Sequence, residues 1–296
     1  MFSRIYNLNG KVVLITGASG GLGRELAFKF FTEGCRVIIA GRNLEKLEQT
    51  RQSIIIDAGN ISTERRHTDI IACELDIGNA DDNLSEKVDQ VVKQIENSFG
   101  TTRLDVLVNN AGVSQRTDFA ETSLSIHRNI FNVNYFGPIE LSKLLLPNML
   151  KSKAPILLNI CSVQSWIAVP GRCSYSASKF ALRAFSDSLR RELGKSLRII
   201  SVYPGYINTN IHTNALAADG LPIQNRIDAS AKDTKGLQVT DVAAKILNCV
   251  ISDNGTTDLM IYSDGFQRIA VFLSYFYPSL LNWYLLRMHI KSKKNN

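Results

Sequence analysis

The sequence predicts an α/β fold: a Rossmann-type, doubly wound parallel sheet forming a single domain, followed by an apolar helical C-terminal tail. Two observations support this prediction. Continuous apolar, β-branched runs such as "KVVLIT" alternate with segments of helical periodicity, and such runs are typical of strands buried on both faces. A glycine-rich turn, "TGASGGLG", joins the first of these strands to the first helix. Alternating strands and helices form right-handed crossovers, which produce a parallel sheet.

Each expected strand is a short apolar run ending in small or polar residues. The strands are expected at 11–16, 35–42, 69–77, 104–112, 154–162, 196–205 and 258–262. The helices are expected at 22–34, 43–54, 79–99, 123–150, 174–193 and 240–252, with the helix of 123–150 stopping near Pro147. Without an internal repeat or a linker, one domain is expected over 1–265. It includes a substrate loop at 205–238, and 266–296 form the tail.

Composition narrows the function classes. The net charge of +7 comes from 34 Lys and Arg against 27 Asp and Glu, and it is not massed in one cluster, so no nucleic-acid partner is expected. Five cysteines without a CxxC pair indicate neither a disulfide framework nor a zinc site. We interpret them as reduced core thiols and expect no metal. The first eleven residues carry no apolar signal or anchor segment.

The glycine turn indicates a dinucleotide. Gly17, Gly21 and Gly23 lie between the first strand and the first helix, where glycines let the backbone approach a pyrophosphate held by the helix N-terminus. The alternative is an ordinary glycine loop.

The end of the second strand indicates which dinucleotide. An NAD site usually has a carboxylate there for the ribose 2′-OH, but this strand ends in Ala40-Gly41-Arg42. Arg42 can pair with a 2′-phosphate, with Ser19 adding a hydroxyl, so the sequence predicts NADP(H). The alternative is that Arg42 is a solvated surface charge.

The segment "YSASK" suggests an acid–base pair. Tyr175 and Lys179 are four residues apart, a spacing that places both side chains on one face of a helix. A neighbouring ammonium favours the phenolate, so we expect Lys179 to lower the pKa of Tyr175. The alternative is two exposed residues on a helix surface.

Five motifs in order resemble the short-chain dehydrogenase/reductase family, over about residues 10–262. They are the glycine turn, Asp76, the "NNAG" segment 109–112, Asn134, and Ser162 with Tyr175-x-x-x-Lys179. The segment "YPGYINT" at 203–209 resembles the family's Pro-Gly segment beside the nicotinamide.

The resemblance implies specific roles. Tyr175 would be the general acid/base and Ser162 would hold the substrate oxygen. Lys179 would bind the nicotinamide ribose, and Asn134 would hold a water that links Lys179 to solvent. Taken singly, Ser162 could instead be a cap and Asn134 a buried amide. The residues expected at the cofactor are Gly17, Ser19, Gly21, Leu22, Gly23, Arg42, Asp76, Asn110, Ala111, Gly112, Tyr175, Lys179, Pro204, Gly205, Ile207 and Thr209.

The tail indicates a surface contact. Residues 269–286 carry no charge for eighteen residues, the lower limit for a spanning helix, but Pro278 interrupts them and favours two short interfacial helices. Membrane contact and protein contact both stay open. The final Lys293-Lys294-Asn295-Asn296 match a dilysine retrieval signal. We expect membrane association at the endoplasmic reticulum, facing the cytosol, with a cytoplasmic or peroxisomal location as the alternative.

Together these features predict an NADPH-dependent carbonyl reductase, reversible as an alcohol dehydrogenase, that works as a homo-oligomer. "PGYINTNIHTNALAADG", "GRN" and the apolar tail resemble one membrane-associated subgroup of the family, implicated in the reduction of lipid ketones. The expected substrate is an apolar ketone: lipid-like, steroid or retinoid. A dinucleotide-sensing protein without turnover and a membrane-surface scaffold remain alternatives. His127 and His212 receive no catalytic role.

Overall fold

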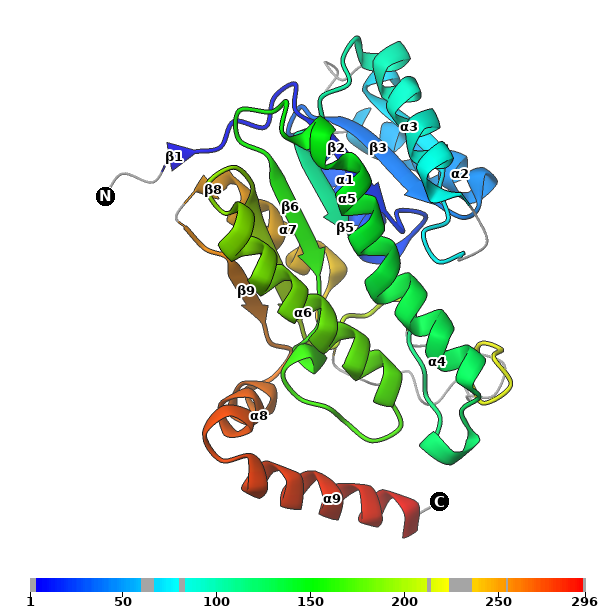
Figure 1. Cartoon of the computed structure of the whole chain (residues 1–296), viewed down its shortest axis with the longest axis vertical. Coiled ribbons are helices and arrows are strands. Elements are labelled where there is room, and N and C mark those ends of the chain that lie inside the picture. The colour runs from blue at the N-terminus through cyan, green and yellow to red at the C-terminus, as the bar shows by residue number, and fades with distance from the viewer. Residues whose placement is uncertain are drawn as a thin grey trace.

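The computed structural model describes residues 4–59, 67–79, 83–211, 214–223, 236–253 and 255–294. Its centre is a seven-stranded sheet in which every strand pair is parallel, in the order β4-β3-β2-β5-β6-β7-β9 (Figure 1). The strands are β2 (Val12–Thr16), β3 (Arg36–Gly41), β4 (Ile70–Glu74), β5 (Val106–Asn109), β6 (Ile156–Ile160), β7 (Arg198–Pro204) and β9 (Asp258–Ile261). The predicted doubly wound parallel sheet is confirmed.

Helices cover both faces of the sheet, which explains why the strands are apolar throughout. In β2, Val13 and Ile15 belong to the apolar cluster on one face of the sheet. Val12 and Leu14 belong to the cluster on the opposite face. The first face carries α1 (Gly21–Thr32), α2 (Leu44–Gly59) and α7 (Val239–Ile251). The second carries α3 (Leu84–Phe99), α5 (Gly137–Met149) and α6 (Cys173–Leu193). Successive residues alternate faces, so two covered faces require continuous apolar strands.

The expected helix over 123–150 consists of three parts. An α-helix, α4 (Leu124–Phe131), runs into a π-helical turn, Asn132–Phe136, and then into α5. Pro147 lies inside α5, which continues to Met149. The π turn was not predicted, because a single turn of five residues is too short to show a period of its own.

A small antiparallel pair was also not predicted. The two-residue strand β1 (Arg4–Ile5) pairs with β8 (Ser252–Asp253) beyond the end of α7. Next to it the Tyr6 hydroxyl donates to the carbonyl of Ala154 at 2.9 Å. Two-residue strands carry no periodicity, so sequence patterning cannot identify them.

The tail forms two helices, as predicted, which we call together the α8–α9 hairpin. It consists of α8 (Gly265–Phe276) and α9 (Pro278–Lys294), broken at Pro278. The Asp264 side chain caps α8 by accepting from the Gln267 amide at 2.8 Å. Figure 1 shows the hairpin next to the end of the sheet at which the strand arrows point. Among the residues that the structure describes, no helix combines the length and apolarity needed to cross a bilayer.

The interpretation of the cysteines needs one correction. Cys35, Cys73, Cys161 and Cys249 are buried free thiols, but Cys173 is exposed at the first residue of α6. The helix begins at the molecular surface there, so this thiol does not enter the core.

Candidate functional site

The predicted site residues meet at one edge of the sheet. Gly17, Asp76, Asn110, Ser162 and Gly205 each follow a different strand, and all those strands end at the same edge because they are parallel. At the centre of this edge β2 lies between β3 and β5, where the strand order reverses. Open α/β sheets bind ligands in the crevice at that position.

The glycine turn fits a pyrophosphate. A Cβ atom at Gly17, which has φ of +65°, would lie 2.8 Å from the Cα of Ala111, and one at Gly23 would lie 2.4 Å from the Gly17 carbonyl oxygen. Gly20 is the N-cap of α1 and has no side chain to bind the amides of the first turn, which also carries no acidic residue. Backbone amides at this helix end are therefore available to an anion.

Asn110 holds the turn in place. Its Nδ2 donates to the carbonyls of Thr16, at 2.9 Å, and Gly17, at 3.2 Å. On the other side, Thr209 Cγ2 lies 3.4 Å from the Cβ position of Gly21. The Pro-Gly segment after β7 thus reaches the glycine turn, as residues binding one cofactor would have to.

The residues expected near the adenosine lie at the edge. Asp76 accepts at Oδ1 from the Gly78 amide at 2.9 Å, a hydrogen bond of the kind found in ordinary turns. Ser19 and Arg42 are exposed. The amide of Ala18 donates to the carbonyl of Ala40 at 3.2 Å, which keeps the glycine turn beside the end of β3.

Tyr175, Lys179 and Ser162 form a buried group. Tyr175 is 8% exposed, Lys179 4% and Ser162 7%, so the alternative of two surface residues is wrong. The Ser162 hydroxyl hydrogen-bonds with the Tyr175 phenol and also accepts from the Gln164 amide at 3.1 Å as a cap. Lys179 Nζ donates to the Ile160 carbonyl at 2.9 Å and lies 6.0 Å from the centroid of the Tyr175 ring.

The expected lowering of the Tyr175 pKa is not found in this geometry. Burial raises the pKa of Tyr175, while the hydrogen bond to Ser162 and the charge of Arg172 act against that rise. Burial likewise lowers the pKa of Lys179, and the Cys161 thiol opposes it. The Lys179 ammonium binds a backbone carbonyl rather than the phenol, so desolvation is the larger effect on the tyrosine.

Asn134 connects two parts of the site. It lies in the π turn, is fully buried and makes three hydrogen bonds. Oδ1 accepts from the Val113 amide at 2.9 Å, while Nδ2 donates to the Val113 carbonyl at 2.9 Å and to Ser178 Oγ at 3.0 Å. It therefore ties the segment after β5 to α6, and it is the buried amide weighed as the alternative.

Gly112 lies beside both Asn134 and Lys179. A Cβ atom on Gly112 would lie 3.3 Å from Asn134 Oδ1 and 3.6 Å from Lys179 Nζ, so glycine allows the two side chains to approach the same point. Leu22, Pro204 and Ile207 are buried, while Ala111 and Gly205 are partly exposed. His212 lies outside the described residues.

Sequence reasoning missed a buried arginine next to the tyrosine. The Arg172 guanidinium carbon is 5.9 Å from the centroid of the Tyr175 ring, and Nη1 donates to Ser114 Oγ at 2.9 Å. His127 Nδ1 hydrogen-bonds with Ser174 Oγ, so this histidine has a partner. The only sequence signal for Arg172 is its place three residues before Tyr175, which does not reveal that it is buried.

Comparison with known proteins gives a consistent result. The family model of the short chain dehydrogenases matches residues 11–220. The chain is 36% identical to dehydrogenase/reductase SDR family protein 7-like from Drosophila melanogaster, over 96% of this chain and 82% of that protein. It is 34% identical to dehydrogenase/reductase SDR family member 7B from Mus musculus, over 92% and 79%. The subgroup that the segment "PGYINTNIHTNALAADG" was predicted to resemble is that of these member 7B and 7-like proteins, and the resemblance is confirmed.

Solved structures show the same fold. A short-chain dehydrogenase from Escherichia coli CFT073, solved with NADPH, is 27% identical, with a TM-score of 0.71 over 87% of this chain and 98% of that one. A short-chain dehydrogenase/reductase from Burkholderia phymatum, solved with NAD, is 23% identical, with a TM-score of 0.72 over 91% and 94%. Given the family model, the relatives and the fold, the chain belongs to the short-chain dehydrogenase/reductase family of oxidoreductases.

Proposed function

We propose that the chain is an NADPH-dependent reductase of apolar ketones that also runs in reverse as an alcohol dehydrogenase. One observation carries the proposal: a buried phenol, Tyr175, hydrogen-bonds with Ser162 and shares a helix turn with Lys179, at the sheet edge where α/β folds bind ligands. A nicotinamide dinucleotide, when bound along the glycine turn, supplies the hydride.

The protein residues supply the proton and hold the substrate. Burial keeps Tyr175 protonated at neutral pH, which is the state in which a phenol donates a proton to a carbonyl oxygen. The Ser162 hydroxyl donates to the same oxygen and stabilises the charge that develops there. Lys179 and Asn134 both lie beside Gly112. In the proposed reaction Lys179 holds the nicotinamide ribose and returns a proton to the phenol.

Two features support the choice of cofactor and substrate. Arg42 is exposed at the end of β3, with no carboxylate at that strand end to repel a 2′-phosphate. Trp166 and Ile167 follow Ser162 within five residues and pack in apolar clusters, which suits an apolar ketone. Lipid-like, steroid and retinoid ketones are the candidates, and a homo-oligomer remains the expected assembly.

The test is turnover of a carbonyl panel with NADPH by the wild type and by Tyr175→Phe. Removing a general acid costs about 10² to 10⁴ in rate, so we expect the variant to lose turnover by at least that lower factor while it still binds NADPH. The matched control is Tyr275→Phe, at an exposed tyrosine of α8, with unchanged turnover. NADPH binding by the wild type without turnover of any carbonyl would favour the dinucleotide sensor instead.

A further inference from the structure

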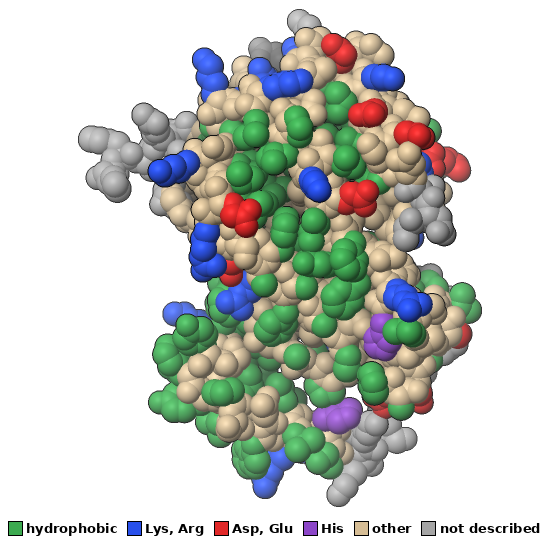
Figure 2. Space-filling view, viewed as in Figure 1, with side chains coloured by type: hydrophobic (Ala, Val, Ile, Leu, Met, Phe, Trp, Pro, Cys, Tyr) green, Lys and Arg blue, Asp and Glu red, His purple; other side chains and the backbone are tan. Residues whose placement is uncertain are grey.

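The outer face of the α8–α9 hairpin is apolar and exposed. On α8, Ile269, Phe272 and Phe276 recur every three or four residues, and on α9 Leu280 and Trp283 are three residues apart, so each helix presents an exposed apolar face of its own. Figure 2 shows hydrophobic side chains gathered over this part of the molecule. The exposed large apolar residues of the hairpin are Phe266, Ile269, Phe272, Tyr275, Phe276, Tyr277, Leu280, Trp283, Tyr284, Leu286, Met288 and Ile290. A patch of this extent indicates a binding surface.

The charges of the hairpin are all of one sign. Residues 265–296 contain five Lys and Arg residues and no Asp or Glu. Arg268, Arg287 and Lys291 are exposed, and the Arg287 guanidinium lies 4.3 Å from the centroid of the Trp283 ring. Aromatic residues beside cations are typical of helices that lie in the head-group region of a bilayer.

This charge pattern favours an anionic surface over a second copy of the chain. In a twofold dimer the same patch faces itself, so the cations of one hairpin would meet those of the other with no carboxylate from either. Anionic lipid offers the complementary charge and an apolar interior for the aromatic rings.

The inner face of the hairpin contacts the candidate site. Ala270 and Leu281 are buried against Ile167, five residues after Ser162. Gln267, at the start of α8, packs closely against Gly205. Its Oε1 atom lies only 2.1 Å from the position that a Cβ atom on Gly205 would take. The hairpin therefore rests on two of the loops that form the site.

We propose that the α8–α9 hairpin lies flat on an anionic lipid surface, with the apolar face of both helices inserted among the acyl chains. The carboxyl edge of the sheet then faces the bilayer. If the proposed reductase function is right, the ketone enters from the lipid.

Flotation of the full chain with vesicles tests the surface without requiring turnover. The protein is expected to float with mixed phosphatidylcholine–phosphatidylserine vesicles and more weakly with phosphatidylcholine alone. Each cation near an anionic surface raises the partition coefficient between vesicle and water about fivefold. The double variant Arg287→Gln with Lys291→Gln should therefore lower the partition coefficient obtained from flotation about twenty-five-fold. Phe276→Ala with Trp283→Ala should lower it on both kinds of vesicle.

Matched controls lie on the far helices. Lys46→Gln with Lys93→Gln removes two exposed cations from α2 and α3, and Ile56→Ala removes an exposed apolar side chain from α2. These variants, and Tyr175→Phe, should float like the wild type. NADPH binding checks that every variant is folded.

Two results would overturn the proposal. One is a wild type that stays at the bottom of the gradient with mixed vesicles while sedimenting as a dimer that Trp283→Ala dissociates, which would assign the face to a second copy. The other is hairpin variants that float like the wild type. Because Tyr175→Phe is expected to float, failure of the reductase and failure of the lipid surface give different results.

Discussion

At the scale of single residues, the main effect on the pKa of the Tyr175 phenol is its removal from water. Tyr175 has lost almost all contact with water, and that loss outweighs the stabilisation of its phenolate by Ser162 and Arg172. Ketone reduction needs the protonated phenol and alcohol oxidation needs the phenolate. In the proposed reaction, the environment of Tyr175 therefore favours ketone reduction at neutral pH, and we expect alcohol oxidation to speed up as the pH rises.

Arg172 provides the first test at this scale. Its charge lowers the pKa of Tyr175, so Arg172→Gln should raise that pKa further and move the pH midpoint of alcohol oxidation upward. Other charged and titratable groups also lie close to this pair. Lys179 Nζ lies 6.0 Å from the centroid of the Tyr175 ring, and Cys161 raises the pKa of Tyr175. The charge of Arg116 lowers the pKa of Arg172.

The pH profile of oxidation measures the effect. Arg172→Lys keeps the charge and should restore most of the wild-type midpoint. An unchanged midpoint in Arg172→Gln would show that the guanidinium acts only as a structural group.

Arg42 provides the second test. A charge-assisted hydrogen bond contributes about 1.5–3 kcal/mol, so Arg42→Asp should shift the preference from NADPH toward NADH by at least about tenfold in kcat/KM. The control is Lys46→Asp, at an exposed residue of α2 nearby, with an unchanged preference. If Arg42→Asp left the ratio of the two cofactors unchanged, Arg42 would be an ordinary surface charge.

At the scale of elements, the π turn Asn132–Phe136 is what brings Asn134 into the site. The loop after β4 packs directly against this segment, because a Cβ atom of Gly78 would lie 2.4 Å from Val133 Cγ2. Gly137, the first residue after the turn, lies under the Ile77 carbonyl. The turn is thus held from one side by a strand-end loop and from the other by α6 through Ser178.

Gly137→Ala tests this packing. The added methyl carbon would lie 2.1 Å from the Ile77 carbonyl oxygen, and backbone shifts of this kind cost about 1–3 kcal/mol. The free energy of unfolding in urea should fall by that amount. Gly265→Ala, where an added Cβ meets nothing within 4 Å, should stay within about 0.5 kcal/mol of the wild type.

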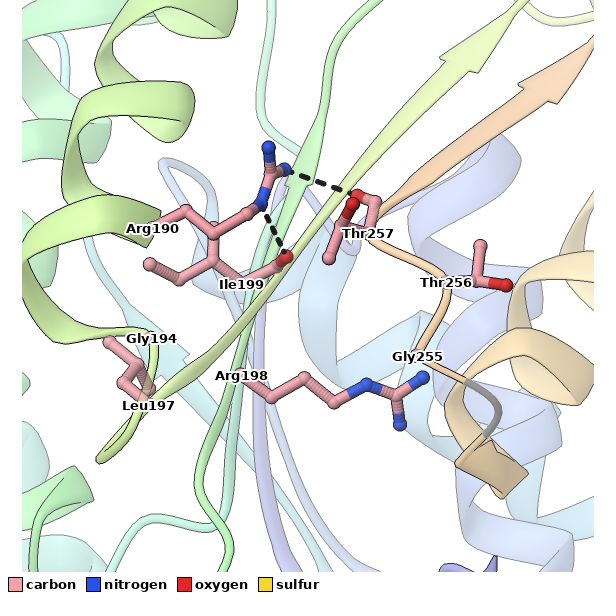
Figure 3. Close-up of a pocket in the computed structure, with 8 residues that line it drawn as sticks. All are labelled: Arg190, Gly194, Leu197, Arg198, Ile199, Gly255, Thr256 and Thr257. Atoms are coloured by element: carbon pink, nitrogen blue, oxygen red, sulfur yellow. Dashed lines mark hydrogen bonds between the residues drawn. The ribbon is translucent and has the colours of Figure 1, made fainter. Parts of the chain in front are cut away.

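At the scale of the whole molecule, the two edges of the sheet carry different features. The carboxyl edge holds the candidate site, while the amino edge holds a pocket of about 290 Å³ between the starts of β7 and β9 (Figure 3). There Arg190 donates to the carbonyls of Ile199, at 3.3 Å, and Thr257, at 3.2 Å, and pairs with Asp187 at 2.8 Å. Arg190 thus joins α6 to two strands far from the phenol.

Arg190→Met should therefore lower stability and spare binding. Losing these hydrogen bonds should cost about 1–3 kcal/mol in the free energy of unfolding, while the KM for NADPH stays unchanged. Arg191→Met, at the exposed neighbouring residue, should change neither quantity. A raised KM in Arg190→Met would mean that the amino edge affects the site.

Sequence patterning predicted the sheet because strands buried on both faces leave an unbroken apolar signal, as in β2 and β7. It also predicted the break at Pro278, since proline cannot continue a helix. It failed where the signal is a property of three-dimensional packing. Burial of Arg172, the π turn around Asn134 and the dominance of desolvation at Tyr175 depend on neighbours distant in sequence, and no local spacing encodes them.

The surface position of Cys173 has a practical consequence. Four of the five thiols are buried, so a maleimide dye should couple to this one without any engineering of the chain. The fluorophore would then stand on the same turn of α6 as Tyr175. Its emission would report directly on whatever enters or leaves the neighbouring crevice.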